Sequence, residues 1–251
     1  MAFVRRPQGF SKDAARELNA WFETLAGQRL AEHEQQLLSA EFRRLFAPLL
    51  VQIGGPVDAI RHSSAAHKLW ITPEPMPDSE VGQVNGWAAQ LPLAGNIADA
   101  VLLMHTLDVT RHPQAVLREA IRILRPGGSL LILGFDPTGW IGIKRSLRLR
   151  GQRAPWLRKQ RLVDWLALLD CRVEQLQCAG YPKRLATLSA YNAPGAAIYL
   201  MRVKKERLIP PNALRQRLRG RLMPLAGSRS QAQVGRSVAR DSVVVPFKRR
   251  R

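Results

Sequence analysis

The sequence predicts an α/β fold in which a mostly parallel β-sheet is covered by helices. Two apolar runs, residues 99–104 and 129–134, show no alternation of polar and apolar side chains, which is typical of strands buried on both faces. Between them lie a helical pattern that opens at His112-Pro113 and a turn at residues 125–128. Strands joined through a helix lie parallel, because the connection is a crossover and not a hairpin. Ligands of such sheets bind at the carboxyl ends of the strands.

The elements before this unit are predicted to be helices followed by short strands. Residues 11–46 have apolar side chains at helical spacing, with Ser11 as a cap and a second helical run after Gly27. We interpret them as a packing arm or a lid ahead of the sheet. Short apolar runs bounded by proline and glycine then predict three strands, at residues 49–53, 67–72 and 81–86.

The elements after this unit end the predicted sheet. The helix that starts at Pro113 carries one apolar stripe, which we expect to cover the sheet. A further helix is predicted at residues 159–169, and two strands at 172–178 and 196–203. No helical pattern separates these strands, so we expect them to form an antiparallel pair.

Composition and charge divide the chain into three parts. We predict a helical arm (1–48), an α/β domain (49–206) and a basic, disordered tail (207–251). Residues 202–251 hold 15 of the 39 Lys and Arg residues but only two of the 19 acids, so much of the net charge of +20 lies there. Such a tail can bind a nucleic acid or an anionic membrane surface, or it can simply keep the protein in solution.

The sequence also indicates a compartment. It has no apolar run long enough to span a bilayer and no signal peptide, so we expect a cytoplasmic protein without a transmembrane segment. Cys171 and Cys178 lie seven residues apart in a predicted strand, so we expect them to point to opposite faces and to remain reduced thiols.

One arrangement of residues resembles a known family. The apolar strand at 99–104 is followed by His105, Leu107 and Asp108, then by His112-Pro113 and by the run Ile123-Leu124-Arg125-Pro126-Gly127-Gly128 before the closing strand. This order, with Gln90-Leu91-Pro92-Leu93 and Asp99 ahead of it, resembles the second half of the class I S-adenosylmethionine-dependent methyltransferases of the type 11-like group. The resemblance covers roughly residues 49–203. It implies a Rossmann-like, mostly parallel seven-stranded sheet with an antiparallel strand near the end, and S-adenosylmethionine as the cofactor.

The first half departs from the family at three positions that contact the cofactor. Gln52 stands where the family has an acid before its glycine-rich turn, and that turn is only Gly54-Gly55-Pro56. The strand at 67–72 ends without the acid that binds the ribose, unless Glu74 serves. Trp87 stands near the family's adenine-binding Asp and can stack on a base but cannot accept its hydrogen bond. The resemblance places the cofactor against Gln52, Gly54, Gly55, Trp87, Ala88, Met104 and His105.

Three side chains after the apolar strands are candidates for catalysis. His105 has a pKa near the working range and is the best base, while Asp108 and Asp136 are further candidates. Each has a structural alternative: the histidine as a hydrogen-bonding group at a strand end, the aspartates as loop or helix caps. The histidines lack the spacing of metal ligands, so we predict no metal.

Two functions remain open from the sequence. The first is a methyltransferase that uses S-adenosylmethionine and an unknown acceptor. The second is a methyltransferase-like domain without turnover that binds RNA, the ribosome or an anionic membrane. Its contacts would be the tail and a basic run, residues 144–158, which starts near Trp140 and includes Trp156. A solvated basic helix is the alternative for that run.

Overall fold

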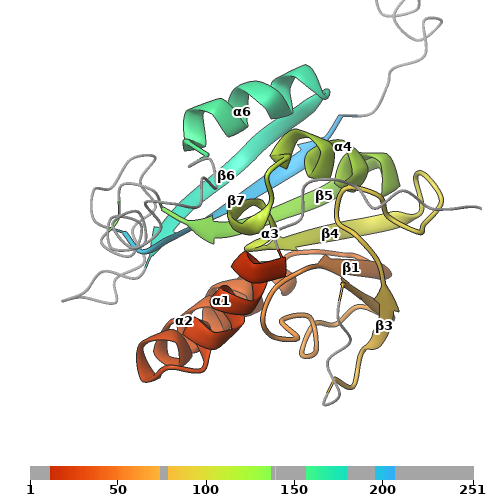
Figure 1. Ribbon diagram of the computed structural model, residues 1–251. Helices are drawn as coiled ribbons and strands as arrows, with labels where there is room; N and C mark the ends of the chain where they lie inside the picture. The colour runs from red at the N-terminus through yellow and green to blue at the C-terminus, as the bar shows by residue number, and fades with distance from the viewer. Residues whose placement is uncertain (1–11, 74–78, 137–138, 140–156, 180–195, 207–251) are drawn as a thin grey trace, which may run out of the picture. The chain divides into compact units, whose positions relative to one another are not determined.

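A computed structural model of the chain describes residues 12–73, 79–136, 139, 157–179 and 196–206 (Figure 1). Its centre is a seven-stranded sheet with the strand order β3-β2-β1-β4-β5-β7-β6. The helices are α1 (Lys12–Phe22), α2 (Leu25–Phe42), α3 (Thr106–Val109), α4 (Pro113–Ile123) and α6 (Lys159–Leu168). The strands are β1 (Leu49–Ile53), β2 (His67–Thr72), β3 (Gly82–Asn85), β4 (Ala98–Met104), β5 (Leu124–Phe135), β6 (Cys171–Ala179) and β7 (Ile198–Lys205).

The strand directions confirm the predicted sheet. β1 to β5 pair in parallel, and β7 runs antiparallel between β5 and β6. β4 is buried along its whole length, as its unbroken apolar sequence predicts. The mostly parallel sheet with an antiparallel strand near the end is therefore present as expected, and its carboxyl ends define the edge at which a ligand would bind.

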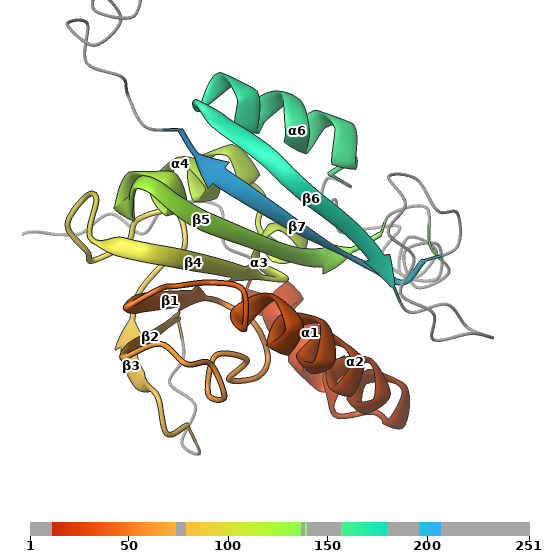
Figure 2. The ribbon, with the colours of Figure 1, turned by 180° about the vertical axis from the view of Figure 1, so that it is seen from behind.

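Different helices cover the two faces of the sheet (Figures 1 and 2). On one face, α4 and α6 pack on side chains such as Val101 and Ile132. On the other face, α1 and α2 pack on Leu102, Met104 and Leu133. The predicted N-terminal helical arm is thus part of the core. The tail at residues 207–251 and the basic run at 144–156 lie outside the described residues, and the predicted domain boundaries remain predictions.

The break in the arm lies before Gly27, not at it. α2 begins after Thr24, whose Oγ1 accepts a hydrogen bond from the Gly27 amide at 3.2 Å. Gly27 lies inside the first turn of α2, where a Cβ would come within 2.2 Å of the Trp21 carbonyl oxygen. The glycine therefore allows the close approach of the two helices and does not end the first one.

Two other local expectations differ from the structure. β5 begins at Leu124, so the predicted turn at 125–128 is an irregular part of the strand, and the register against β4 shifts between Ala98 and Ala100. Cys171 and Cys178 are free and buried as expected, but both belong to the core on the α4 and α6 side. The irregularity in β6 between Val173 and Gln175 explains this, because one extra residue reverses the alternation of the faces.

Candidate active site

The turn after β1 lies against the end of β4. Gly54 and Gly55 have φ angles of 67° and 91°, a backbone conformation that residues with a side chain rarely adopt. A Cβ on Gly55 would come within 2.9 Å of the Met104 side chain, and a Cβ on Gly54 within 2.7 Å of the Thr106 hydroxyl. The structure therefore brings together three of the predicted cofactor residues, Gly54, Gly55 and Met104, at the carboxyl edge.

Gln52 organises the loop that follows this turn. Its buried amide nitrogen donates to the carbonyl oxygens of Gly54 (3.0 Å) and Val57 (2.8 Å), and its amide oxygen accepts from the Ala59 amide (3.0 Å). The Trp70 indole of β2 also donates to the Gly54 carbonyl at 2.9 Å. The side chain that replaces the family's acid is thus engaged in holding its own loop.

Trp87 and Ala88 follow β3 at the same edge. Trp87 is half-buried and forms an isolated antiparallel bridge with Gln90. Ala88 and Leu91 are buried in the core on the α4 side. Glu74, the alternative ligand for the ribose, lies outside the described residues.

The second half of α4 fixes this loop from the other side. Glu119 accepts a hydrogen bond from the Leu91 amide at 3.0 Å. Arg122 donates to the carbonyl oxygens of Leu91 (3.2 Å) and Leu93 (2.9 Å). The Leu-Pro element and the helix therefore form one hydrogen-bonded unit. Asp99, by contrast, lies at the opposite end of β4, where it accepts from the Leu49 amide at 2.7 Å.

His105 is fully buried between two carboxylates. Its Nδ1 lies 2.9 Å from Asp108 Oδ2 on α3, and its Nε2 lies 2.9 Å from Glu34 Oε1 on α2. It has a φ of 51°, in the left-handed region that a non-glycine residue rarely occupies. Because both ring nitrogens face carboxylates, both donate, and the imidazole is a cation.

The electrostatics agree with this geometry. Burial by itself lowers the pKa of His105, but the negative charge of Glu34 and the hydrogen bonds to both carboxylates outweigh it and raise the pKa to about 9. Around this cation, the Phe135 ring lies 4.3 Å and the Phe22 ring 5.4 Å away, centroid to centroid. The arm is thereby joined to the ends of β4 and β5 by one ion pair and by ring contacts.

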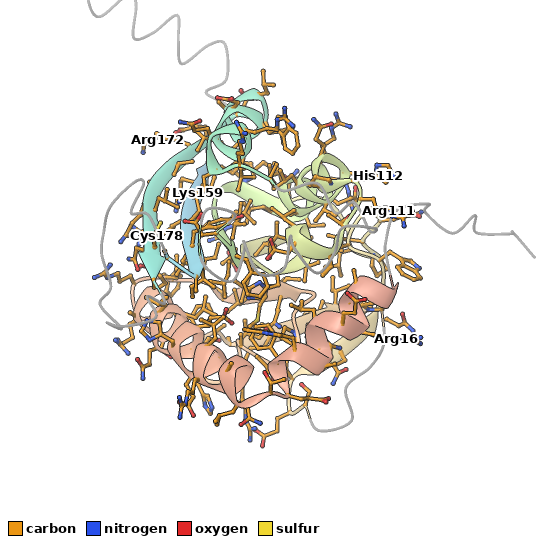
Figure 3. All side chains as sticks on the ribbon, turned by 60° about the vertical axis from the view of Figure 1, so that its left-hand side comes forward. Arg16, Arg111, His112, Lys159, Arg172 and Cys178 are labelled. Atoms are coloured by element: carbon orange, nitrogen blue, oxygen red, sulfur yellow. The ribbon has the colours of Figure 1, made fainter. Side chains whose placement is uncertain are left out.

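Asp136 belongs to a second cluster, at the end of β5. Its Oδ2 accepts from Lys159 Nζ of α6 at 2.6 Å, and the same nitrogen lies 3.6 Å from Cys178 Sγ of β6. Burial alone lowers the pKa of Lys159, but the hydrogen bond and charge of Asp136 raise it. In Figure 3, Lys159 and Cys178 lie beside β6 and β7, away from Arg111 and His112 at the start of α4.

The negative charges of both clusters act on Tyr199 of β7. Burial, followed by the charges of Asp108 and Asp136, raises the pKa of its phenol well above the ordinary value, so the hydroxyl stays protonated. The structure therefore brings His105 and Asp108 into direct contact and places Asp136 in a separate cluster. The charges of Asp108 and Asp136 both raise the pKa of Tyr199.

Two of these residues were not predicted from the sequence. Glu34 lies far from His105 along the chain, on a helix whose buried face carries mostly apolar side chains. Lys159 stands at the start of a helix in a basic stretch, where nothing distinguishes it from its neighbours. The signal that the sequence offers for Glu34 is its place on the apolar stripe of α2, between Leu30 and Leu38.

Among the residues that the structure describes, no group of three His, Cys, Asp or Glu side chains is arranged so that it could hold a metal ion. None of the described helices is long and apolar enough to cross a membrane. The prediction of no metal remains a prediction, as does the cytoplasmic location.

Part of the chain matches a known methyltransferase domain. Residues 45–132 match the methyltransferase domain family. The chain is 26% identical over 201 residues to the Escherichia coli protein YafS, covering 76% of this chain and 82% of that one. It is 40% identical over 57 residues to demethylmenaquinone methyltransferase of Mycobacterium tuberculosis, which is 23% of this chain and 24% of the relative.

Solved structures have the same fold. A methyltransferase from Thermotoga maritima superposes with a TM-score of 0.55 at 19% identity, covering 77% of this chain and 97% of that one. The N-methyltransferase NodS from Bradyrhizobium japonicum, in complex with S-adenosylhomocysteine, superposes with a TM-score of 0.54 at 14% identity, covering 77% and 99%.

The strand order and the glycine turn at the end of β1 define a Rossmann-like α/β protein. Together with the match of residues 45–132 to the methyltransferase domain family, this fold resembles that of the class I S-adenosylmethionine-dependent methyltransferases. Of the two functions open from the sequence, these comparisons support the methyltransferase, and none of them favours a binding module without turnover.

S-adenosylmethionine is the cofactor that the resemblance implies, and the matched methyltransferase domain agrees with it. The backbone at the carboxyl end of β1 fits it, because two consecutive glycines with positive φ allow a ligand to approach the main chain. The side chain of Gln52 does not replace the missing acid, since its donors and its acceptor are used within the loop.

Proposed function

We propose that the chain transfers the methyl group of S-adenosylmethionine to an acceptor bound beside the carboxyl ends of β4 and β5. The observation that carries this proposal is the glycine turn packed against Met104, directly beside the buried His105 cluster. When bound, the cofactor supplies an already activated methyl group, so the protein has to position the acceptor and exclude water.

The proposed cofactor contacts are those that the resemblance implies. Gly54 and Gly55 offer backbone groups, and Trp87 offers a ring for stacking on the adenine. Gln52, Met104 and Ala88 would contact the cofactor from within the core, in which all three are buried. His105 fixes the end of β4 through its two carboxylate partners.

Among the three candidates for catalysis, Asp136 is the best placed to take up a proton from the acceptor. Both ring nitrogens of His105 donate to carboxylates, so neither has a free lone pair. Asp108 Oδ2 accepts from both His105 and the Phe135 amide. Asp136 is paired with Lys159, which acts as its positioning residue.

The acceptor is not assigned from the relatives. The quinone methyltransferases match over less than a quarter of this chain, so their substrates are not carried over. We therefore propose a methyltransferase whose methyl donor is S-adenosylmethionine, without assigning its acceptor.

Calorimetric titration with S-adenosylmethionine tests the donor site. We expect micromolar affinity, and a roughly tenfold loss or more for Trp87→Ala, because stacking of a base on an aromatic ring contributes about 1–3 kcal/mol. Trp165→Ala on α6, which packs on the core away from the turn, is the control and keeps the affinity. Absence of heat at millimolar cofactor contradicts the proposed function.

A further inference from the structure

Glu34 carries a buried carboxylate oxygen without a partner. The residue is fully buried on α2, and its Oε1 lies 2.9 Å from His105 Nε2. No donor among the described residues reaches its Oε2. A buried polar atom without a hydrogen bond is costly, and a carboxylate oxygen more so, because it carries part of a charge.

The charge around His105 is not balanced by the groups that surround it. Glu34 and Asp108 contribute two negative charges, and the imidazolium of His105 contributes one positive charge. Asp108 Oδ2 is satisfied by His105 and by the Phe135 amide. The three groups therefore carry a net charge of −1, and Glu34 Oε2 is a buried acceptor to which a cation with hydrogen-bond donors could bind.

This oxygen belongs to the cofactor edge of the sheet. His105 stands in the chain between Met104 and Thr106, and each of these neighbours lies against one glycine of the turn after β1. The arm thus brings a carboxylate to the region where the family has a strand-terminal acid, while Gln52 occupies the place of that acid.

We propose that Glu34 binds the α-ammonium group of S-adenosylmethionine through Oε2 and so supplies, from the N-terminal arm, the carboxylate that β1 lacks. This inference rests on the proposed function. An ammonium group brings three donors and one positive charge, which match the unpaired acceptor and the excess negative charge. A consequence is that the arm, and not only the sheet, is part of the cofactor site.

The test compares three ligands by calorimetry on the full chain. S-adenosylmethionine and S-adenosylhomocysteine both carry the ammonium group, whereas 5′-methylthioadenosine lacks it. Glu34→Gln should weaken the first two by about tenfold to a hundredfold, the range expected for a charged hydrogen bond, and leave the third unchanged. Equal weakening of all three, or of none, overturns the inference. Weakening of S-adenosylmethionine alone overturns it in favour of a contact with the sulfonium.

The matched control is Glu41→Gln on the same helix. Glu41 is equally buried, but its oxygens are already bound by Arg202 (2.8 Å) and Gln177 (3.2 Å). Its replacement should lower stability and leave the relative affinities of the three ligands unchanged. If it changes them as Glu34→Gln does, the effect comes from the packing of α2 and the inference fails.

A second measurement does not depend on the folding of a variant. In the wild-type protein, the ring ¹⁵N resonances of His105 should shift when S-adenosylhomocysteine binds and stay in place with 5′-methylthioadenosine, because only the former places a charge beside Glu34. Identical shifts with both ligands overturn the inference. If none of the three ligands binds the wild-type protein, the proposed function itself fails.

Discussion

Between β4 and β5 the chain runs through α4, whose apolar face covers the sheet, whereas between β1 and β4 the described residues form no helix. The loop after β1 is fixed from inside by Gln52 and Trp70. In the second half, buried apolar side chains of α4 such as Val116 and Leu117 pack on the sheet. The first half of the sheet is therefore shaped by buried polar side chains, and the second by ordinary helix packing.

This difference shows why the family pattern is visible in one half only. A helix packed on a parallel sheet imposes a long apolar pattern with its own turn signals, and that pattern survives in the sequence. A loop held by one buried glutamine leaves no comparable pattern. The three predictions below test whether the two halves respond to substitution as their contacts require.

The largest effect is expected from Gln52→Glu, which introduces the family's acid. A carboxylate would face the carbonyl oxygens of Gly54 and Val57, to which Gln52 now donates. The loss of two buried hydrogen bonds and the burial of a charge should reduce the free energy of unfolding by about 3–5 kcal/mol. Urea denaturation measures it. The control is Gln90→Glu at an exposed position, and equal stability of the two variants would contradict the assignment of Gln52.

The second effect is a loss of stability at alkaline pH through His105. The pKa in the folded state, about 9, lies above the ordinary value of 6.5. The stabilisation is therefore fully present below pH 6.5 and is lost as the pH rises through 9, and it amounts to roughly 3 kcal/mol. Unfolding free energies from pH 6 to 10 should show this slope, and His105→Gln should remove it. A wild-type curve that is flat over this range would argue against a protonated His105.

The smallest effect is expected in the second half, from Arg122→Ala. The guanidinium binds two carbonyl oxygens and Glu119, but its side chain is 40% exposed, so solvent screens the interaction. We expect a loss of about 1 kcal/mol in the free energy of unfolding. The control is Arg118→Ala at an exposed position of the same helix, which should change stability by less than about 0.5 kcal/mol.

The sequence predicted the sheet better than the site. The bounds of β1 and β2 and the start of α4 at Pro113 agree with the structure, because each follows from a local apolar run or a local stop signal. The contact of Glu34 with His105 joins residues 71 positions apart, and no local rule contains it. The second helix was predicted to begin after Gly27 for a related reason: glycine is common at helix ends, but here it allows a close approach between two helices.

β7 lies between β5 and β6, so the edge of the sheet that β6 forms can assemble only after β7 has been synthesised. β6 hydrogen-bonds only to β7 among the described strands, although β7 comes later in the chain. During synthesis β6 therefore emerges without a neighbour, and its backbone groups stay unpaired until Lys205 has been added. A chain that stops before Ile198 would leave β5 as an open border of the sheet.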